Sequence, residues 1–336
     1  MMRLRHRAII GAVVAIGAVP LMAPAGASVR ARPRIALVES AGATGQRGLG
    51  RDLRAGFIRA ASDVGFRPSL FIVGPGQDPL SEIGRVVDRR FDLIVLALAT
   101  PSLPQIVAEA AAAFPHARIL VPELETSALA QPAPNVKGYV FRVEQPSYLA
   151  GYLAASMGAP ASGRHDISAV GGVPLPVVKR FLAGYAAGAR AEDPRIRVLT
   201  DYSYDFAATP KCRSLALQQI ANGSRAVFDV AGACGEGALH AAIQRGAWGI
   251  GVDFDHASLG PRILTSVLKR EGVALAHELR AFGQGRLSTG RTDFLGLREG
   301  AVGLGKLSPA VPAGLRRTLG RLRAAIAAGR LHVAAS

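Results

Sequence analysis

Two apolar runs in the last third of the sequence end at an acid and at a base. The run Trp248–Val252 stops at Asp253, and the run Ile263–Leu268 stops at Lys269. Continuous apolar runs are typical of parallel strands buried on both faces, and ligands of open α/β sheets bind at the carboxyl ends of such strands. We therefore expect Asp253 and Lys269 to share a polar site. The alternative is that Asp253 caps the next turn and Lys269 begins a solvated helix.

Acid–base catalysis is one chemistry that this stretch could support. Asp253 and Asp255 could act as acid and base, with His256 beside them. However, Asp255 lies beyond the expected strand end, where nothing fixes its direction, and we interpret His256 as a solvated loop residue. The sequence also has no Gly-x-Ser-x-Gly motif and no His pair at metal-ligand spacing. We predict that the protein is not an enzyme and has neither a metal site nor a cofactor.

A glycine-rich stretch follows the first expected strand, with Gly42, Gly45, Gly48 and Gly50 ahead of a helix. It lacks the G-x-G-x-x-G spacing of a dinucleotide site, and the second strand ends at Val73 without a ribose-binding acid. We interpret it as the cleft loop of a binding protein. Backbone amides at the start of its helix could bind an anion or a hydroxyl group.

Two further segments follow strands of the second half of the chain. The turn 231–237 contains Gly232, which would let the backbone approach a ligand, and Glu236, which could make a polar contact. A plain strand-to-helix turn accounts for the same residues equally well. The segment 201–206 ends a strand, so Phe206 could line a cleft.

The sequence contains two cysteines, Cys212 and Cys234. Each lies at the start of an expected helix that follows a strand of the same sheet, so the two side chains could meet at one end of that sheet. We predict a structural disulfide, which the chain-entropy model values at ~3 kcal/mol. Disulfides persist in exported proteins, and a metal site is disfavoured because no His partner lies nearby.

The first 28 residues have the composition of a secretory signal. Arginines precede an apolar run, Ala8–Met22, and Ala25–Ala27 resembles a cleavage site. The run contains Pro20 and falls short of the roughly 18 residues of a membrane span, although retention as an anchor is an alternative. We expect an exported, extracytoplasmic protein. Because no Cys lies near the cleavage site, we expect no N-terminal lipid anchor.

The formal net charge of +16 raises the question of nucleic-acid binding. The arginines are scattered through every segment, and basic residues are not interleaved with aromatic ones. We therefore interpret the charge as solvated surface and expect no nucleic-acid partner. Contact with an acidic membrane or envelope surface is the remaining functional interpretation.

Strand and helix patterns alternate along the chain after a Pro-Arg linker. Apolar strand patterns separated by helical patterns indicate parallel βαβ units and three-layer domains. Because the pattern repeats, we predict an α/β fold of two lobes. The expected segments are lobe 1 (29–142), lobe 2 (143–260), a return to lobe 1 (261–290) and a last crossover with C-terminal strands and a helix (291–336). Ligands commonly bind at interfaces between domains.

Several motifs resemble the basic membrane protein family, the purine-nucleoside-receptor type of substrate-binding protein of ABC transporters. The segments that carry this resemblance are Tyr139–Gln145, Leu149–Gly151, Gly171–Tyr185, Ala231–Gly237, Gly249–Asp255 and Leu264–Arg270. The resemblance as a whole covers essentially the whole chain after the first 28 residues, in order and with short gaps. The resemblance implies a type I periplasmic binding fold, with two doubly wound three-layer lobes joined by a three-strand hinge.

The resemblance also implies roles for individual residues. In nucleoside-binding relatives, an Asp and a Lys that match Asp253 and Lys269 hold the ribose hydroxyls. The first-lobe loop departs from the family pattern, because Gln46, Leu49 and Gly50 stand near the positions of the base-reading acid and the stacking Phe. The departure puts purine-nucleoside binding in doubt and leaves a hydroxylated ligand as the expectation.

The sequence thus predicts an extracytoplasmic solute-binding protein of an ABC-type importer. It would act as a monomer, capture a small hydroxylated metabolite, nucleoside-like or related, and deliver it to a membrane permease and ATPase. The alternative is a receptor or accessory sensor with the same fold and an altered ligand, which signals through a membrane partner.

Overall fold

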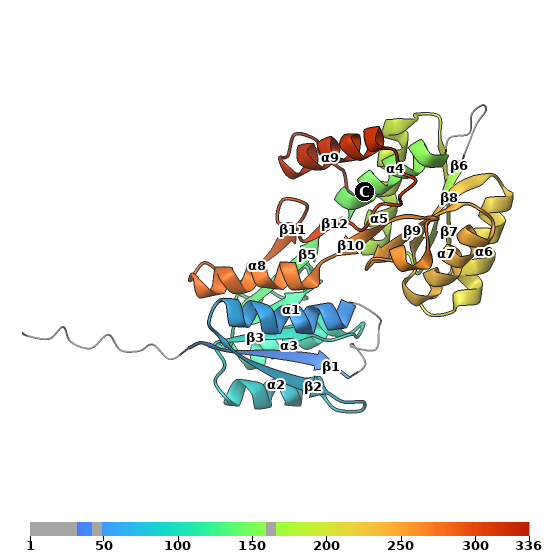
Figure 1. The fold of residues 1–336 in the computed structure, drawn as a ribbon. Coiled ribbons are helices and arrows are strands. Elements are labelled where there is room, and N and C mark those ends of the chain that lie inside the picture. Colours follow the sequence, from blue (N-terminus) through green and yellow to red (C-terminus); the bar gives the residue numbers. More distant parts are fainter. Residues whose placement is uncertain (1–31, 42–48, 159–165, 336) are drawn as a thin grey trace, which may run out of the picture. The chain divides into compact units, whose positions relative to one another are not determined.

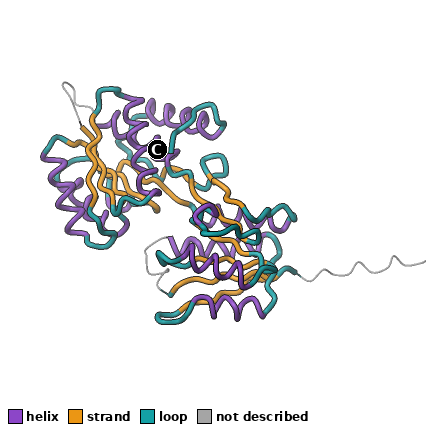
Figure 2. The backbone as a smooth tube through the Cα atoms, turned by 180° about the vertical axis from the view of Figure 1, so that it is seen from behind, coloured by secondary structure: helices purple, strands orange, loops and turns teal. Residues whose placement is uncertain are grey.

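Two six-stranded sheets, each covered by helices on both faces, form the core of the protein (Figure 1, Figure 2). The structure is a computed structural model that describes residues 32–41, 49–158 and 166–335. The predicted α/β fold with two three-layer lobes is confirmed. The expected signal segment, residues 1–28, and Gln46 lie outside the described residues.

The first sheet has the strand order β11-β5-β4-β3-β1-β2, and all of its strand pairs are parallel. Its strands are β1 Arg34–Ser40, β2 Arg67–Val73, β3 Leu93–Ala97, β4 Ile119–Pro122, β5 Val136–Phe141 and β11 Arg291–Leu295. The apolar side chains on its two faces belong to two separate clusters. Helices α1 (Leu49–Asp63) and α8 (Glu271–Gly283) contribute to one cluster, and α2 (Pro79–Asp88) and α3 (Leu103–Ala113) to the other.

The second sheet has the order β12-β10-β9-β8-β6-β7, with β12 alone antiparallel to its neighbour. Its strands are β6 Asp166–Gly171, β7 Arg197–Tyr202, β8 Ser224–Val230, β9 Trp248–Asp253, β10 Ile263–Lys269 and β12 Val302–Leu304. Helices α4 (Glu144–Gly158) and α5 (Pro176–Glu192) pack on one face, and α6 (Thr209–Ala221) and α7 (Gly235–Gln244) on the other. The remaining elements are α9 (Ala313–Ala327), which packs on α4, and three 3-10 turns, η1 Thr126–Ala128, η2 Gly232–Cys234 and η3 Ala257–Leu259.

The chain passes between the two sheets three times, as the predicted three-strand hinge requires. It crosses after β5, after β10 and between β11 and β12. The expectation that residues 261–290 return to the first lobe is wrong for β10, which pairs in parallel with β9 of the second sheet. The run Ile263–Val267 is buried, so it needs a neighbouring strand on each side, and β9 and β12 provide them.

The return to the first lobe therefore begins at α8, which packs against α1. The two helices approach closely at Gly56 and Gly272: a Cβ on Gly56 would lie 2.1 Å from Gly272 Cα. Asp52 accepts a hydrogen bond from the backbone N–H of Gly272 at 3.2 Å. Only glycine at position 56 allows this contact without a shift of one helix.

We expect Gly56→Ala to destabilise the protein by about 1–3 kcal/mol, because the added methyl group must push the α1 and α8 backbones apart. Urea unfolding monitored by circular dichroism measures the change. Gly320→Ala is the matched control, since Gly320 is an exposed residue of α9 where an added methyl group would have no described atom within 4 Å. Equal stability of the two variants would contradict the close approach.

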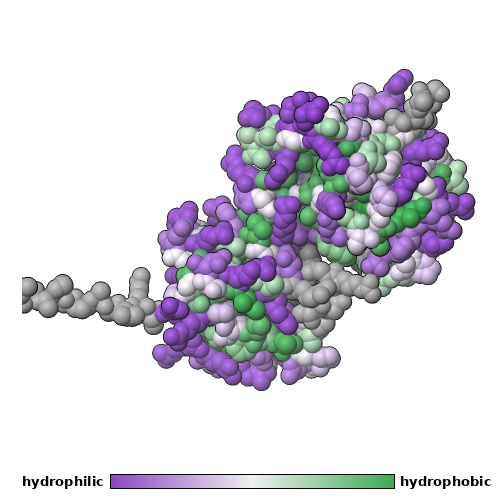
Figure 3. All heavy atoms as spheres, viewed as in Figure 1, coloured by the Kyte–Doolittle hydropathy of each residue, from purple (hydrophilic) through white to green (hydrophobic). Residues whose placement is uncertain are grey.

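Hydrophilic residues cover the displayed face of both lobes, with apolar residues between them (Figure 3). The exposed large apolar side chains belong to separate elements, among them Leu70 and Ile72 of β2 and Val273 of α8. Within the described residues, none of the helices has both the length and the apolar character to cross a membrane.

Candidate ligand-binding site

The structure brings Asp253 and Lys269 together. They lie at the carboxyl ends of the adjacent parallel strands β9 and β10, and Lys269 Nζ is 3.4 Å from Asp253 Oδ1. Both residues therefore project from one sheet, not from two facing walls as the sequence-based lobe boundaries implied. The side chain of Lys269 is 10% exposed, so it is not the solvated helix start of the alternative interpretation.

Lys269 also contacts the first sheet. Its Nζ donates a hydrogen bond to Glu123 Oε1 at 2.8 Å, and Glu123 directly follows β4. Burial lowers the pKa of Lys269, but attraction to Asp253, Glu123 and Glu271 outweighs burial and raises the pKa above its usual value. The ammonium group therefore stays charged throughout the physiological pH range.

Glu271 is the most buried acid of this group. Burial and then repulsion from Glu123 raise its pKa well above the usual value, while Lys269 opposes the rise. The Tyr139 hydroxyl donates a hydrogen bond to Glu271 Oε2 at 3.3 Å. Glu271 therefore belongs to the same buried polar cluster as Lys269.

Asp253 has an unusual backbone and an unsatisfied side-chain oxygen. Its φ of 66° lies in the left-handed region, which Asp adopts more readily than most residues but still at some cost. Its Oδ1 is buried and receives no hydrogen bond from any described residue. The same oxygen lies 3.4 Å from Lys269 Nζ, so the ion pair compensates part of its burial, and it keeps the capacity to accept a hydrogen bond from a ligand.

A cavity of about 260 Å³ opens beside this pair. Its lining residues are Asp52, Asp253, Phe254, Asp255, Leu268, Lys269 and Arg270. The set combines acids and bases with the apolar side chains Phe254 and Leu268. Such a lining can hydrogen-bond a polar ligand and pack against its carbon atoms.

The loop after β9 contains Asp255, which was expected to have no fixed direction, and His256, which was expected to be solvated. Asp255 is exposed and caps the loop, because its carboxylate accepts the N–H groups of Ala257 at 3.1 Å and Lys306 at 2.9 Å. The interpretation of His256 as a solvated residue is wrong. Its ring is buried and stacks on Phe254 with 4.2 Å between centroids, because the loop folds back over β9.

The remaining predicted contacts lie elsewhere. Leu49 and Gly50 begin α1, whereas Gly232 begins the turn η2, Glu236 lies in the first turn of α7 and Phe206 lies in the loop between β7 and α6. The Phe206 ring is 40% exposed and packs on Gly172, where an added Cβ would lie 2.2 Å from it. None of these five residues is among those that line the cavity in the described part of the chain.

A family of known proteins shares the sequence pattern of this chain. The model of the family described as "ABC transporter substrate-binding protein PnrA-like" matches residues 71–326. The chain belongs to this family. The resemblance to the basic membrane protein family is thereby confirmed, since curated relatives carry that name.

One such relative of this PnrA-like family member is Basic membrane protein B of Borrelia garinii subsp. bavariensis. It is 37% identical over 175 residues, which are 51% of this chain and 50% of the relative. The chain thus spans about half the length of the curated relatives it matches.

Solved structures show the same fold. A solute-binding protein of an ABC transporter system from Aeropyrum pernix K1 has a TM-score of 0.69 at 21% identity, covering 90% of this chain and 94% of that one. A second from Conexibacter woesei has a TM-score of 0.65 at 23% identity, covering 90% and 98%. The predicted type I periplasmic binding fold is confirmed.

Three site residues of this PnrA-like chain were missed in the sequence. Glu123 follows β4 as Asp253 follows β9, so the strand-end argument would have found it. Asp52 and Glu271 lie in the first turns of α1 and α8, where acids usually interact with the helix itself. Nothing in the neighbouring sequence distinguishes these two acids from acids that interact only with their own helix.

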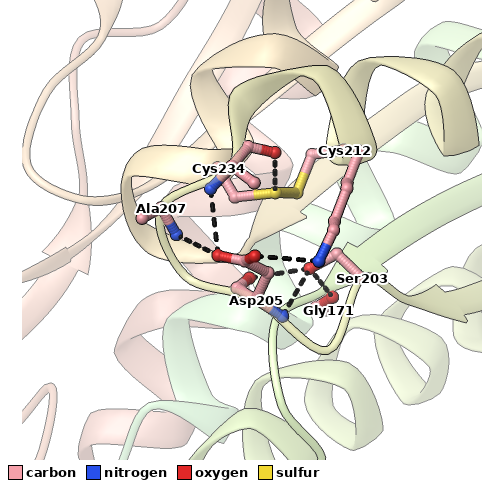
Figure 4. Close-up of polar contacts among 8 residues, drawn as sticks. Gly171, Ser203, Asp205, Ala207, Cys212 and Cys234 are labelled. Carbon is pink, nitrogen blue, oxygen red and sulfur yellow. Dashed lines mark hydrogen bonds and ion pairs between the residues drawn. A yellow bond between two sulfur atoms is a disulfide. The ribbon is translucent and has the colours of Figure 1, made fainter.

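The predicted disulfide is present and links the first turn of α6 to the turn η2 (Figure 4). Cys212 and Cys234 are bonded, with 5.6 Å between their Cα atoms, and the Cys234 N–H donates to Phe206 O at 3.0 Å. Asp205 stabilises the loop between β7 and α6, because it accepts hydrogen bonds from the N–H groups of Ala207 and Ala208 and pairs with Lys211. Hydrogen bonds from Ala207, Ala208 and Lys211 lower the pKa of Asp205.

We expect the double variant Cys212→Ala/Cys234→Ala to lose about 3 kcal/mol of stability, since the bond closes a loop with a sequence separation of 22. Chemical unfolding with and without a thiol reductant measures the loss. The reductant should lower the stability of the wild type to that of the variant and leave the stability of the variant unchanged. A variant as stable as the oxidised wild type would contradict the structural role.

Proposed function

We propose that the protein is the substrate-binding component of an ABC-type importer and captures a small hydroxylated metabolite at Asp253 and Lys269. One observation carries the proposal: Asp253 and Lys269 form an ion pair at 3.4 Å and line one cavity, and the buried Oδ1 of Asp253 receives no hydrogen bond from any described residue. A carboxylate accepts hydrogen bonds from hydroxyl groups, and an ammonium group donates to their lone pairs. Adjacent hydroxyls of a sugar, nucleoside or polyol fit both partners.

Ligand binding would involve both lobes. Lys269 joins the second sheet to Glu123 of the first, and Arg180 of α5 pairs with Glu125, which follows β4. A ligand hydroxyl on Lys269 would share the ammonium protons with Glu123. A ligand that binds one arrangement of the lobes more tightly than another shifts the population towards it, and a membrane permease with its ATPase could recognise that arrangement.

The ligand class follows from the residues at the start of α1. Leu49 and Gly50 provide neither the acid nor the aromatic ring by which nucleoside-binding relatives read a base. Phe206, the predicted apolar contact, is not among the residues that line the cavity beside Lys269 in the described part of the chain. The ligand is therefore defined by its hydroxyl groups, and nucleoside-like compounds are one class among those to be tried. We propose an extracytoplasmic, monomeric protein.

Thermal unfolding of the purified protein with nucleosides, pentoses, hexoses and polyols tests this function. At a ligand concentration ~100 times Kd, binding stabilises the folded state by about 2.7 kcal/mol and raises Tm. Asp253→Asn should remove the rise, whereas Asp88→Asn, an exposed acid at the end of α2, should keep it. No rise with any class, or an unchanged rise in Asp253→Asn, would contradict the proposal.

A further inference from the structure

A second cavity, of about 250 Å³, lies where two of the three crossovers meet the C-terminal segment. Arg142 lies between β5 and α4, and Phe294 to Glu299 span the end of β11 and the crossover to β12. The segment after α9 completes the lining with Leu331, His332 and Val333. No residue is shared between this cavity and the one beside Lys269.

Two guanidinium groups are held in place at this cavity with their terminal nitrogens available. Arg142 Nε donates to Phe294 O at 3.4 Å, and Arg298 Nε donates to Ala327 O at 3.2 Å. In the described part of the chain, the terminal nitrogens of both arginines form no hydrogen bond and have no carboxylate within ion-pair distance. Because each arginine uses only its Nε, both terminal nitrogens of its guanidinium group can donate hydrogen bonds to an anion.

The nearby acids are engaged by the backbone. Glu299 Oε2 accepts the Gly296 N–H at 2.7 Å, although Glu299 itself lines the cavity. Glu144, at the start of α4, is buried, and burial raises its pKa while Arg142, Arg180 and His332 oppose the rise. Neither carboxylate lies within ion-pair distance of Arg142 or Arg298 in the described part of the chain, so an anion can pair with the two guanidinium groups.

The remaining lining contains the polar residues Gln145 and His332 together with apolar side chains. Phe294 is 43% exposed, and the Arg142 guanidinium lies over its ring at 5.5 Å from the centroid. Ile326, Leu331 and Val333 provide aliphatic surface in the same cavity. An inorganic anion would use the arginines and leave this surface unused, whereas a ring attached to a carboxylate would use both.

We propose that this cavity is a second binding site, separate from the cleft at Lys269, for a small aromatic carboxylate. Arg142 and Arg298 bind the carboxylate, and the ring packs against Phe294 and the aliphatic side chains. The site lies on the crossovers after β5 and between β11 and β12, so its occupant contacts both segments.

Isothermal titration of the purified protein with benzoate tests the site. Benzoate should bind. Benzyl alcohol lacks the carboxylate and inorganic phosphate lacks the ring, so each should bind at least about tenfold more weakly. Arg298→Gln and Arg142→Gln should each weaken benzoate binding about tenfold or more. Arg317→Gln, an exposed arginine of α9 outside the cavity, is the matched control and should bind as the wild type does.

Several outcomes would overturn the site. Absence of benzoate binding up to ~5 mM would exclude it, as would arginine variants with unchanged affinity. Phosphate binding as tight as benzoate binding would exclude the aromatic ligand. Asp253→Asn should retain benzoate binding, and its loss there would place benzoate in the cleft instead. Arg298 is exposed, so Arg298→Gln should fold, as circular dichroism can verify, even if Arg142→Gln does not.

Discussion

Lys269→Met is expected to abolish ligand binding and to destabilise the protein by about 3–5 kcal/mol at neutral pH. The substitution keeps the length of the side chain and removes the one cation that contacts both Glu123 and Asp253 among the described residues. Removing one partner of a buried ion pair leaves uncompensated charge, and that cost exceeds what the pair contributes to stability. Isothermal titration with a ligand found in the thermal screen, together with urea unfolding, measures both effects.

The pH dependence of this variant separates lost charge from lost packing. The pKa of Lys269 is raised in the folded protein, so its contribution is present at all pH values below the unfolded pKa of about 10.4 and is lost only above it. Met does not titrate, so the destabilisation by Lys269→Met should be constant between about pH 7 and about pH 9 and shrink above about pH 10, whereas a loss of packing alone would give a difference that does not change with pH.

Lys179→Met is the matched control, since Lys179 is exposed on α5. It should change stability by less than about 0.5 kcal/mol. If Lys269→Met unfolds at the same urea concentration as this control, the ion-pair cluster does not stabilise the fold. If it also binds ligand as tightly, Lys269 is not part of the site.

Asp229→Asn is expected to remove a large pH dependence of stability. Asp229 of β8 has no exposed surface, accepts the Ala231 N–H at 3.0 Å and has an Oδ2 without a hydrogen bond from any described residue. Burial raises its pKa to about 8. Since its unfolded pKa is about 3.9, the folded state binds the proton more tightly than the unfolded state does.

The sign of the effect follows from this difference. The stabilisation by protonated Asp229 is present in full below about pH 4 and is lost as the pH rises through about 8, on the order of 5 kcal/mol in total. Asn keeps the shape and the hydrogen bond from Ala231 without titrating. Urea unfolding across this range should show the wild type losing stability relative to Asp229→Asn, whereas Asp88→Asn should follow the wild type. A pH-independent difference would mean that Asp229 is ionised in the folded protein.

The sequence predicts the positions of most elements because apolar periodicity decides local structure. Strands β9 and β10 begin and end within a few residues of the apolar runs that indicate them. The sheet to which a strand belongs is not a local property. β10 was expected in the first lobe but lies in the second sheet, and the C-terminal strands β11 and β12 lie in different sheets.

The same distinction applies to the site. Asp253 and Lys269 were found because both follow buried strands, and the carboxyl ends of neighbouring parallel strands lie together. The contact from Glu123 depends on how the end of β4 in the first sheet meets the end of β10 in the second, which no local pattern encodes. His256 is buried because the loop after β9 folds back over that strand. The pattern of polar and apolar residues does not predict this path of the loop.

Native mass spectrometry of the protein as purified tests most directly whether Asp253 and Lys269 hold a hydroxylated ligand. We predict that the wild type and Asp88→Asn carry a small bound molecule, released on denaturation, that contains adjacent hydroxyl groups, and that Asp253→Asn carries none. A wild type that remains ligand-free after incubation with nucleosides, sugars and polyols, or an Asp253→Asn variant that retains the same molecule, would contradict the assignment.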